Sequence, residues 1–83
     1  MRLTVKYFAS IRESLGRGSE AVDTSATTPA QLRDELVARG GAYAQSLARG
    51  KSVRVALNQV MSEESAPLLE GCEVAFFPPV TGG

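Results

Sequence analysis

Apolar and polar residues alternate along several segments of the chain, a pattern of period two that is typical of β-strands. In the N-terminal segment, Leu3, Val5 and Tyr7 share one face and the residues between them share the other. The strands expected from this pattern cover residues 2–8, 20–24, 52–57, 60–61 and 73–77. The last of these segments is apolar on both faces, which favours a central position in a sheet or contact with a partner.

A helical spacing of apolar residues occupies the middle of the chain. Thr28 suits the N-cap and Pro29 the first position of a helix that is predicted over residues 29–39. Its leucines recur one turn apart, whereas Arg33 is among the charged residues that occupy the remaining surface. Gly40 offers a left-handed exit from this helix. Shorter helical segments are expected at 9–15 and 42–48.

The order of these elements predicts one α+β domain with a β-grasp, or ubiquitin-like, fold. In this arrangement an N-terminal hairpin contributes to a mixed sheet of four to five strands, and one main helix packs across the sheet. The first and last strands run parallel in the middle. We expect the domain to occupy residues 1–77 and a flexible, extended Gly-Gly tail to occupy residues 78–83.

The composition excludes several classes of function. Among the 83 residues, nine Lys+Arg balance nine Asp+Glu, so no net charge favours nucleic acid or an anionic membrane as a partner. No apolar run approaches the roughly 20 residues of a membrane span. The chain has no histidine and one cysteine, which excludes a nucleophile–histidine pair, a histidine metal site and an internal disulfide. We therefore expect a cytoplasmic protein that binds no metal or cofactor and is no enzyme on its own.

The C-terminal segment is the strongest candidate for function. It reads Pro78, Pro79, Val80, Thr81, Gly82 and Gly83. The prolines end the preceding strand and stiffen the exit, whereas the final glycines carry no side chains. Fully extended, this segment reaches at most about 20 Å, enough to thread a terminal carboxylate into another protein's active site. A frayed terminus is the alternative interpretation, because glycine is common at disordered ends.

Two further motifs favour structural roles. Gly50-Lys51-Ser52 resembles the end of a phosphate-binding loop, but Gln45 stands where that motif needs its first glycine. A turn before a strand is therefore expected there. Cys72 follows a turn, and acidic residues rather than cations lie beside it in the sequence, which favours a structural thiol.

Two surface features are candidates for contact with a partner. Arg49, Lys51 and Arg54 form a basic cluster ahead of a strand, which we interpret mainly as a solvated face and otherwise as a docking site for an acidic surface. Phe8 and Phe77 lie on the strand faces opposite their core-facing neighbours. If their strands are adjacent, they form an apolar patch near the tail; packing under a loop is the alternative.

Several motifs together resemble the small-subunit family of molybdopterin synthase, the sulfur carriers of molybdenum cofactor synthesis. The similar segments are VAFFPPVTGG at 74–83, YFA followed by IRE at 7–13, ALNQ at 56–59 and PLLEG at 67–71. The chain departs from the family at Cys72, where Asp or Asn is usual, and at Tyr43, where Trp is frequent. Both departures lie outside the tail, so they concern local packing rather than the carrier role.

The resemblance implies a mechanism. The carboxylate of Gly83 is adenylated by an ATP-dependent, E1-like enzyme and converted, with a sulfurtransferase as sulfur donor, to a thiocarboxylate. The large catalytic subunit then receives the sulfur for a pterin precursor, forming the dithiolene within a heterotetramer of two small and two large subunits. An ionised carboxylate is a poor electrophile, so a partner must supply the leaving group. The residues expected to contact partners are Gly82, Thr81, Val80, Pro79, Phe77 and Phe8.

Other functions stay open. A thiocarboxylate carrier of another pathway, such as thiamine synthesis, would also end in Gly-Gly. A ubiquitin-like modifier would instead join Gly83 to lysines of target proteins. A β-grasp interaction module would have no chemistry at its terminus.

Overall fold

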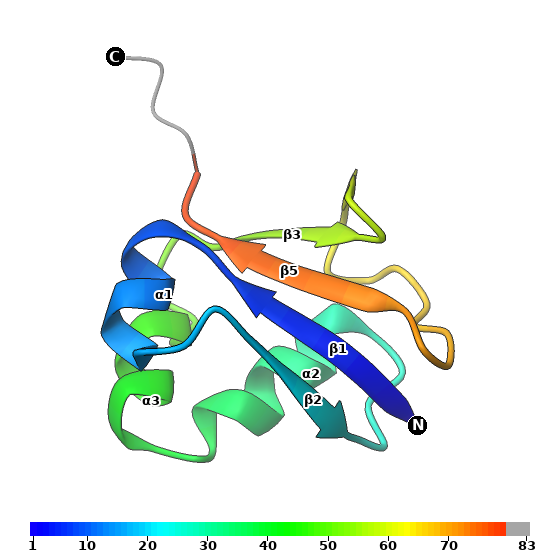
Figure 1. Cartoon of the computed structure of the whole chain (residues 1–83), viewed down its shortest axis with the longest axis horizontal. Coiled ribbons are helices and arrows are strands. Elements are labelled where there is room, and N and C mark those ends of the chain that lie inside the picture. Colours follow the sequence, from blue (N-terminus) through cyan, green and yellow to red (C-terminus); the bar gives the residue numbers. More distant parts are fainter. Residues whose placement is uncertain (80–83) are drawn as a thin grey trace.

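The computed structural model describes residues 1–79 and contains a five-stranded mixed sheet with helices packed on it (Figure 1). Along the chain the elements are β1 (Arg2–Tyr7), α1 (Ala9–Leu15), β2 (Ser19–Asp23), α2 (Pro29–Val37), α3 (Gly41–Leu47), β3 (Arg54–Leu57), β4 (Val60–Ser62) and β5 (Glu73–Phe77). The strand order across the sheet is β2-β1-β5-β3-β4. The predicted β-grasp architecture is confirmed, because β1 and β5 are parallel neighbours in the middle of the sheet.

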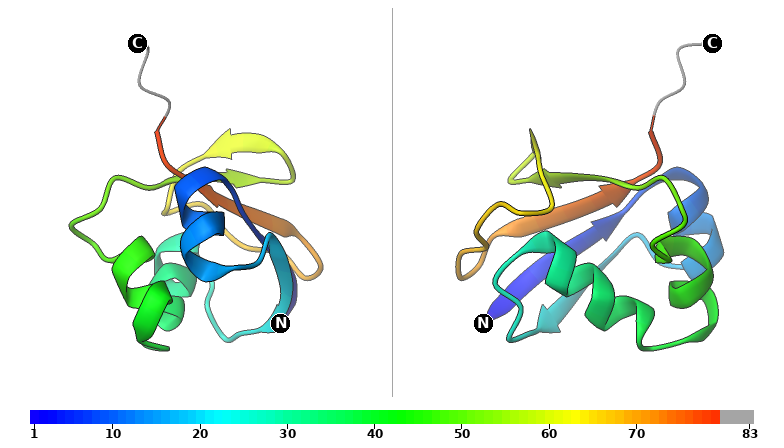
Figure 2. Two further views of the ribbon diagram at one scale, coloured as in Figure 1. Left: turned by 60° about the vertical axis from the view of Figure 1, so that its left-hand side comes forward. Right: turned by 180° about the vertical axis from the view of Figure 1, so that it is seen from behind.

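The helices lie on one side and at one end of the sheet. Figure 2 shows α2 and α3 in front of the sheet when the molecule is seen from behind, whereas α1 covers the end at which β1 finishes. Side chains that alternate inward from the central strands form the core; Val5, Val74 and Phe76 are fully buried. They pack in one cluster with the leucines of α2, which include Leu32 and Leu36.

The main helix is shorter than predicted. It begins as expected, since the Thr28 side chain accepts a hydrogen bond from the Gln31 backbone N–H and Pro29 takes the first helical position. It ends at Val37 rather than at position 39, because the chain tightens into a final turn there. The backbone N–H of Gly40 donates to the Val37 carbonyl, and a φ of 76° at this glycine turns the chain into α3.

Arg33 is buried, with only 4% of its surface exposed, although its position among charged residues suggested a place on the solvated surface. Its guanidinium donates to the carbonyls of Leu47, Ala48 and Lys51 at 2.6, 2.7 and 2.9 Å. It also forms an ion pair with Glu64 at 3.0 Å. A buried cation is stable only when its donors are satisfied, and here they hold together α2 and the loop between α3 and β3.

A second polar network is centred on Glu20 of β2, whose side chain is 11% exposed. The hydroxyls of Tyr7 and Tyr43 each donate to its Oε2 at 2.7 Å, and Arg39 contacts its Oε1 at 3.0 Å. Burial raises the pKa of Glu20, but the hydrogen bonds from Tyr43, Tyr7 and Arg39 together lower that pKa below its usual 4.5. The ionised carboxylate therefore joins β1, β2 and α3.

Replacing Glu20 by glutamine should destabilise the fold by about 1–3 kcal/mol at neutral pH, because donors would be left without a charged acceptor. Since the pKa of Glu20 is lower in the folded chain than in the unfolded one, its ionised form stabilises the fold above about pH 4.5. This stabilisation is lost as the pH falls through the folded-state pKa. Urea unfolding across this range should show a smaller pH dependence for Glu20→Gln than for the unmodified chain. Glu13→Gln on α1 removes an exposed carboxylate that takes no part in this network, and it is the matched control.

Candidate functional site at the end of the central strand

The central strand β5 directs the chain out of the domain at one end of the sheet. In the register, Phe76 lies beside Tyr7 of β1, and Phe77 lies opposite Arg54 of β3. The Phe8 backbone N–H still donates to the Phe76 carbonyl at 3.2 Å. Pro78 then ends the ladder, because proline has no N–H to donate. The end of β1, the start of β3 and the end of β5 therefore meet where the chain leaves the sheet.

Only the first part of the predicted tail lies within the described residues. Pro78 and Pro79 are half-buried and follow β5 directly. Val80, Thr81, Gly82 and Gly83 lie outside the described residues, so their roles stay predictions.

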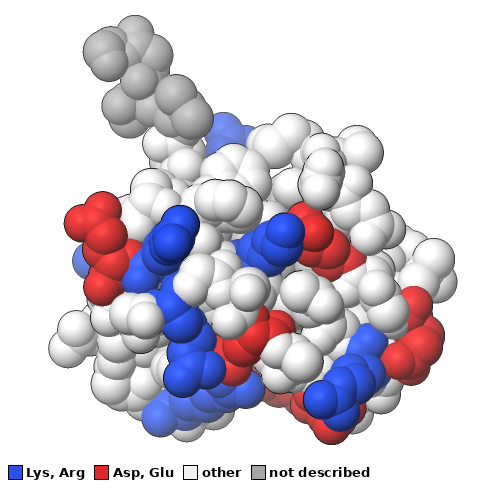
Figure 3. Space-filling model, viewed as in Figure 1, with Lys and Arg blue, Asp and Glu red and all other residues white. Residues whose placement is uncertain are grey.

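An apolar patch formed by Phe8 and Phe77 lies beside this exit. Phe77 is half-buried and lies on the sheet face opposite that of the buried Phe76, whereas Phe8 is 44% exposed just beyond the end of β1. The surface just below the grey atoms in Figure 3 is largely white and therefore uncharged. The predicted adjacency of the two strands is confirmed, but Phe8 caps α1 rather than ending β1. Ala9, with a φ of 52°, turns the chain there into α1.

The predicted basic cluster is not one unit. Arg49 belongs to a separate network, in which it pairs with Asp34 at 3.0 Å and with Glu64 at 3.1 Å. The hydrogen bonds that Arg49 donates to the Asp34 carboxylate raise the pKa of Arg49 and outweigh the effect of burial. Within residues 1–79, neither Lys51 nor Arg54 forms an ion pair with a carboxylate. Arg49 is therefore a half-exposed, ion-paired residue, as expected of a solvated face, whereas Lys51 and Arg54 lie near the exit of β5.

Cys72 and the Gly50-Lys51-Ser52 segment have the structural roles that the sequence predicted for them. Cys72 is a buried free thiol within the core cluster. The Gly50-Lys51-Ser52 segment follows a helix rather than a strand, and the Lys51 N–H closes a turn on the Ala48 carbonyl at 2.8 Å.

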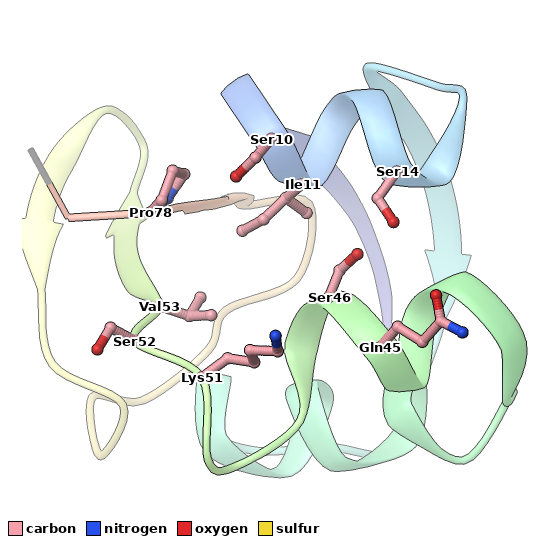
Figure 4. A pocket seen from close by; sticks show the side chains of 9 residues that line it. All are labelled: Ser10, Ile11, Ser14, Gln45, Ser46, Lys51, Ser52, Val53 and Pro78. Atoms are coloured by element: carbon pink, nitrogen blue, oxygen red, sulfur yellow. The ribbon is translucent and has the colours of Figure 1, made fainter.

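A pocket beside the exit could not be found from the sequence. It has a volume of about 350 Å³ and is lined by residues from α1, α3, the segment before β3 and Pro78 (Figure 4). These residues are far apart in the sequence and share no spacing pattern. The predicted strand over 52–57 begins only at Arg54, so Ser52 and Val53 line this pocket instead.

The described part of the chain holds neither a metal site nor a membrane-spanning helix. Among residues 1–79, no three side chains of the His, Cys, Asp and Glu types are grouped so that they could hold a metal ion. No helix within the same residues has the length and apolarity needed to cross a membrane.

The chain is similar to known proteins over almost its whole length. The ThiS family matches residues 5–83. The molybdopterin synthase sulfur carrier subunit of Escherichia coli is 40% identical over 81 residues, covering 98% of this chain and 99% of the relative. The corresponding subunit of Haemophilus influenzae is 37% identical with the same coverage.

Solved structures show the same fold. SAMP1 from Haloferax volcanii superimposes with a TM-score of 0.78 at 26% identity over 100% of both chains. A chain of the complex of subunits 1 and 2 of the molybdopterin-converting factor from Helicobacter pylori gives 0.68 at 24% identity, again over 100% of both chains. The chain belongs to the ThiS family and, within it, to the sulfur carrier subunits of molybdopterin synthase.

Proposed function

We propose that the chain carries sulfur as a thiocarboxylate on Gly83 and delivers it through the tail that follows β5. The observation that carries the proposal is the full-length similarity to sulfur carrier subunits, which includes the C-terminal residues. The position of β5 supports it. A central strand bonded on both sides gives the tail a rigid base, so the path of Pro78 and Pro79 is set by the sheet.

The chemistry needs a partner at each step. An oxygen of the Gly83 carboxylate attacks the α-phosphorus of ATP on an E1-like enzyme, and pyrophosphate leaves. A hydrosulfide ion supplied by the sulfurtransferase then attacks the acyl carbon, AMP leaves, and the thiocarboxylate remains. In the last step, on the large subunit, the thiocarboxylate sulfur adds to an electrophilic carbon of the pterin precursor. Water then hydrolyses the resulting thioester, which leaves the sulfur on the pterin and restores the Gly83 carboxylate. The chain itself contributes the reacting carboxylate and the surface that positions it.

The partners follow from the same proposal. The large subunit of molybdopterin synthase receives the tail, and two copies of each subunit form a heterotetramer. The E1-like enzyme and the sulfur donor act before this assembly, and all of these steps take place in the cytoplasm. Val80, Thr81 and Gly82 are the tail residues that we expect to contact these partners, with Gly82 at a point where a side chain would not fit.

Intact mass measurement tests the proposal directly. The chain is purified after incubation with the adenylating enzyme, ATP and a sulfur donor. We expect a gain equal to the exchange of one oxygen for one sulfur, located by fragmentation at Gly83. If the mass of the chain is unchanged after incubation with all three components, while a control carrier is modified in parallel, the proposal is contradicted.

A second function is favoured by one observation. SAMP1 from Haloferax volcanii has the same fold over its full length, and a second structure from that organism is described as small archaeal modifier protein 1. A modifier would form an isopeptide bond between Gly83 and target lysines. Protein adducts that contain the Gly-Gly remnant on lysine would favour this function, whereas sulfur exchange without adducts favours the carrier.

Replacing Phe8 or Phe77 by aspartate should weaken binding of the large subunit by about tenfold or more, because a charge would be buried in an apolar contact. Titration of the labelled chain with the purified large subunit measures the effect. Leu69→Asp is the matched control, since Leu69 is 69% exposed and lies in the turn before β5, at the other end of the strand.

Thermal melts of all three variants accompany this titration. If the two phenylalanine variants bind as well as Leu69→Asp, the patch is no interface. If Phe77→Asp unfolds while Phe8→Asp binds normally, Phe77 belongs to the core.

A further inference from the structure

The pocket beside the exit of β5 is polar and carries a positive charge. Figure 4 shows Ser10 and Ser14 of α1 on one side, Ser46 of α3 on another, and Lys51 and Ser52 on the segment before β3. Hydroxyl groups can donate hydrogen bonds, and the lysine ammonium is a donor without acceptor capacity. The lining therefore matches a ligand that offers oxygen acceptors and a negative charge.

Lys51 is free to bind such a ligand. Its side chain is exposed, and no hydrogen bond or ion pair to its ammonium occurs among the described residues. By contrast, the backbone of the same loop is held firmly, because Arg33 donates to the carbonyls of Ala48 and Lys51. A cation on a rigid loop loses less conformational freedom on binding than one on a mobile segment.

The position of the pocket defines what can fill it. Pro78 forms part of the wall and is the first residue after β5, so a protein that takes up the tail covers the pocket as well. Arg54 lies opposite Phe77 at the same end of the sheet and has no ion pair within residues 1–79. At the opposite end, Arg2 is paired with Asp23. Lys51 and Arg54, two of the cations that form no ion pair within residues 1–79, therefore lie near the tail exit.

We propose that this pocket receives an aspartate or glutamate side chain of the molybdopterin synthase large subunit. The inference rests on the proposed function, because it takes the occupant from the protein that receives the tail. The carboxylate pairs with the Lys51 ammonium and accepts hydrogen bonds from the serine hydroxyls. Such a contact fixes the orientation of the domain beside the apolar patch, since charged pairs at an interface set register and specificity.

Charge reversal at Lys51 tests the proposal. Lys51→Glu should raise the dissociation constant for the large subunit by about tenfold and reduce its dependence on salt. Arg2→Glu makes the same change of net charge at the far end of the sheet and should alter the constant by less than about twofold. Ser46→Met fills the pocket without changing charge and should weaken binding about as much as Lys51→Glu. Thermal melts show whether each variant is folded.

The outcomes separate this proposal from the proposed function. If the unmodified chain neither binds the large subunit nor accepts sulfur, the proposed function fails. If it binds and Lys51→Glu behaves like Arg2→Glu, only the pocket proposal is wrong. If Lys51→Glu weakens binding of the large subunit but Ser46→Met does not, no carboxylate enters the pocket, and Lys51 acts only through diffuse electrostatic attraction. Sulfur loading by the adenylating enzyme should be unchanged in Lys51→Glu. If this variant loses loading but binds the large subunit normally, the pocket receives the adenylating enzyme instead of the large subunit.

Discussion

Deleting Gly83 should abolish thiocarboxylate formation and leave the melting temperature unchanged. The core cluster and the strand pairing lie within residues 2–77, so the deletion removes none of their contacts. The new terminal carboxylate, however, is one residue or about 3.3–3.6 Å short of the activating centre. The measurement is a thiocarboxylate assay with the adenylating enzyme, ATP and a sulfur donor, run beside thermal melts.

Two further variants make this experiment specific. Gly82→Trp keeps the length of the tail but adds a side chain, which should block adenylation in a channel shaped for bare backbone. One residue added after Gly83 should be as damaging as the deletion, because the reacting carbon is then displaced. Sulfur loading of the Gly83 deletion at the rate of the full chain would contradict the carrier function.

Replacing Arg33 by methionine should destabilise the fold by about 3–5 kcal/mol, because it removes one partner of a buried ion pair. The variant leaves the carbonyls of Leu47, Ala48 and Lys51 without their guanidinium donor and leaves Glu64 without one of its cations. Domains have total stabilities of only about 5–15 kcal/mol, so the variant should be measured by urea unfolding in the cold.

Arg49→Met is the matched control, since Arg49 also contacts Glu64 but is half exposed. Exposed ion pairs contribute about 0–1 kcal/mol, so this variant should lose much less stability. Equal stability of the two variants would show that Arg33 does not hold the loop between α3 and β3.

The fold could be predicted from the sequence because local patterns specify it. Alternation identifies β1 as a strand, the apolar residues on both faces of β5 indicate its central position, and Thr28 with Pro29 fixes the start of α2. Burial of Arg33 could not be predicted. Its acceptors are backbone carbonyls of a loop 14 or more residues away, and a carbonyl is present at every position regardless of side chain.

Part of the candidate site could likewise be predicted from the sequence, and part could not. The tail is a contiguous motif, so its residues could be identified directly. The Glu20 network and the pocket beside Pro78 bring together side chains from separate elements, and only the packing of α1 and α3 against the sheet creates them. Phe8 was identified from alternation, but the left-handed turn at Ala9 that leaves it exposed was not.

The parallel pairing of β1 with β5 has a consequence for how the chain folds. β1 forms a local antiparallel pair with β2, and β3 forms another with β4, but β5 alone joins the two pairs. That junction aligns Val5 with Val74, which are 69 positions apart in the sequence. Contacts of such long range must overcome the entropy of closing a large loop before they stabilise anything. Neither strand pair is therefore stable by itself, and the domain should form in a single cooperative step that is slower than that of a helical bundle of similar size.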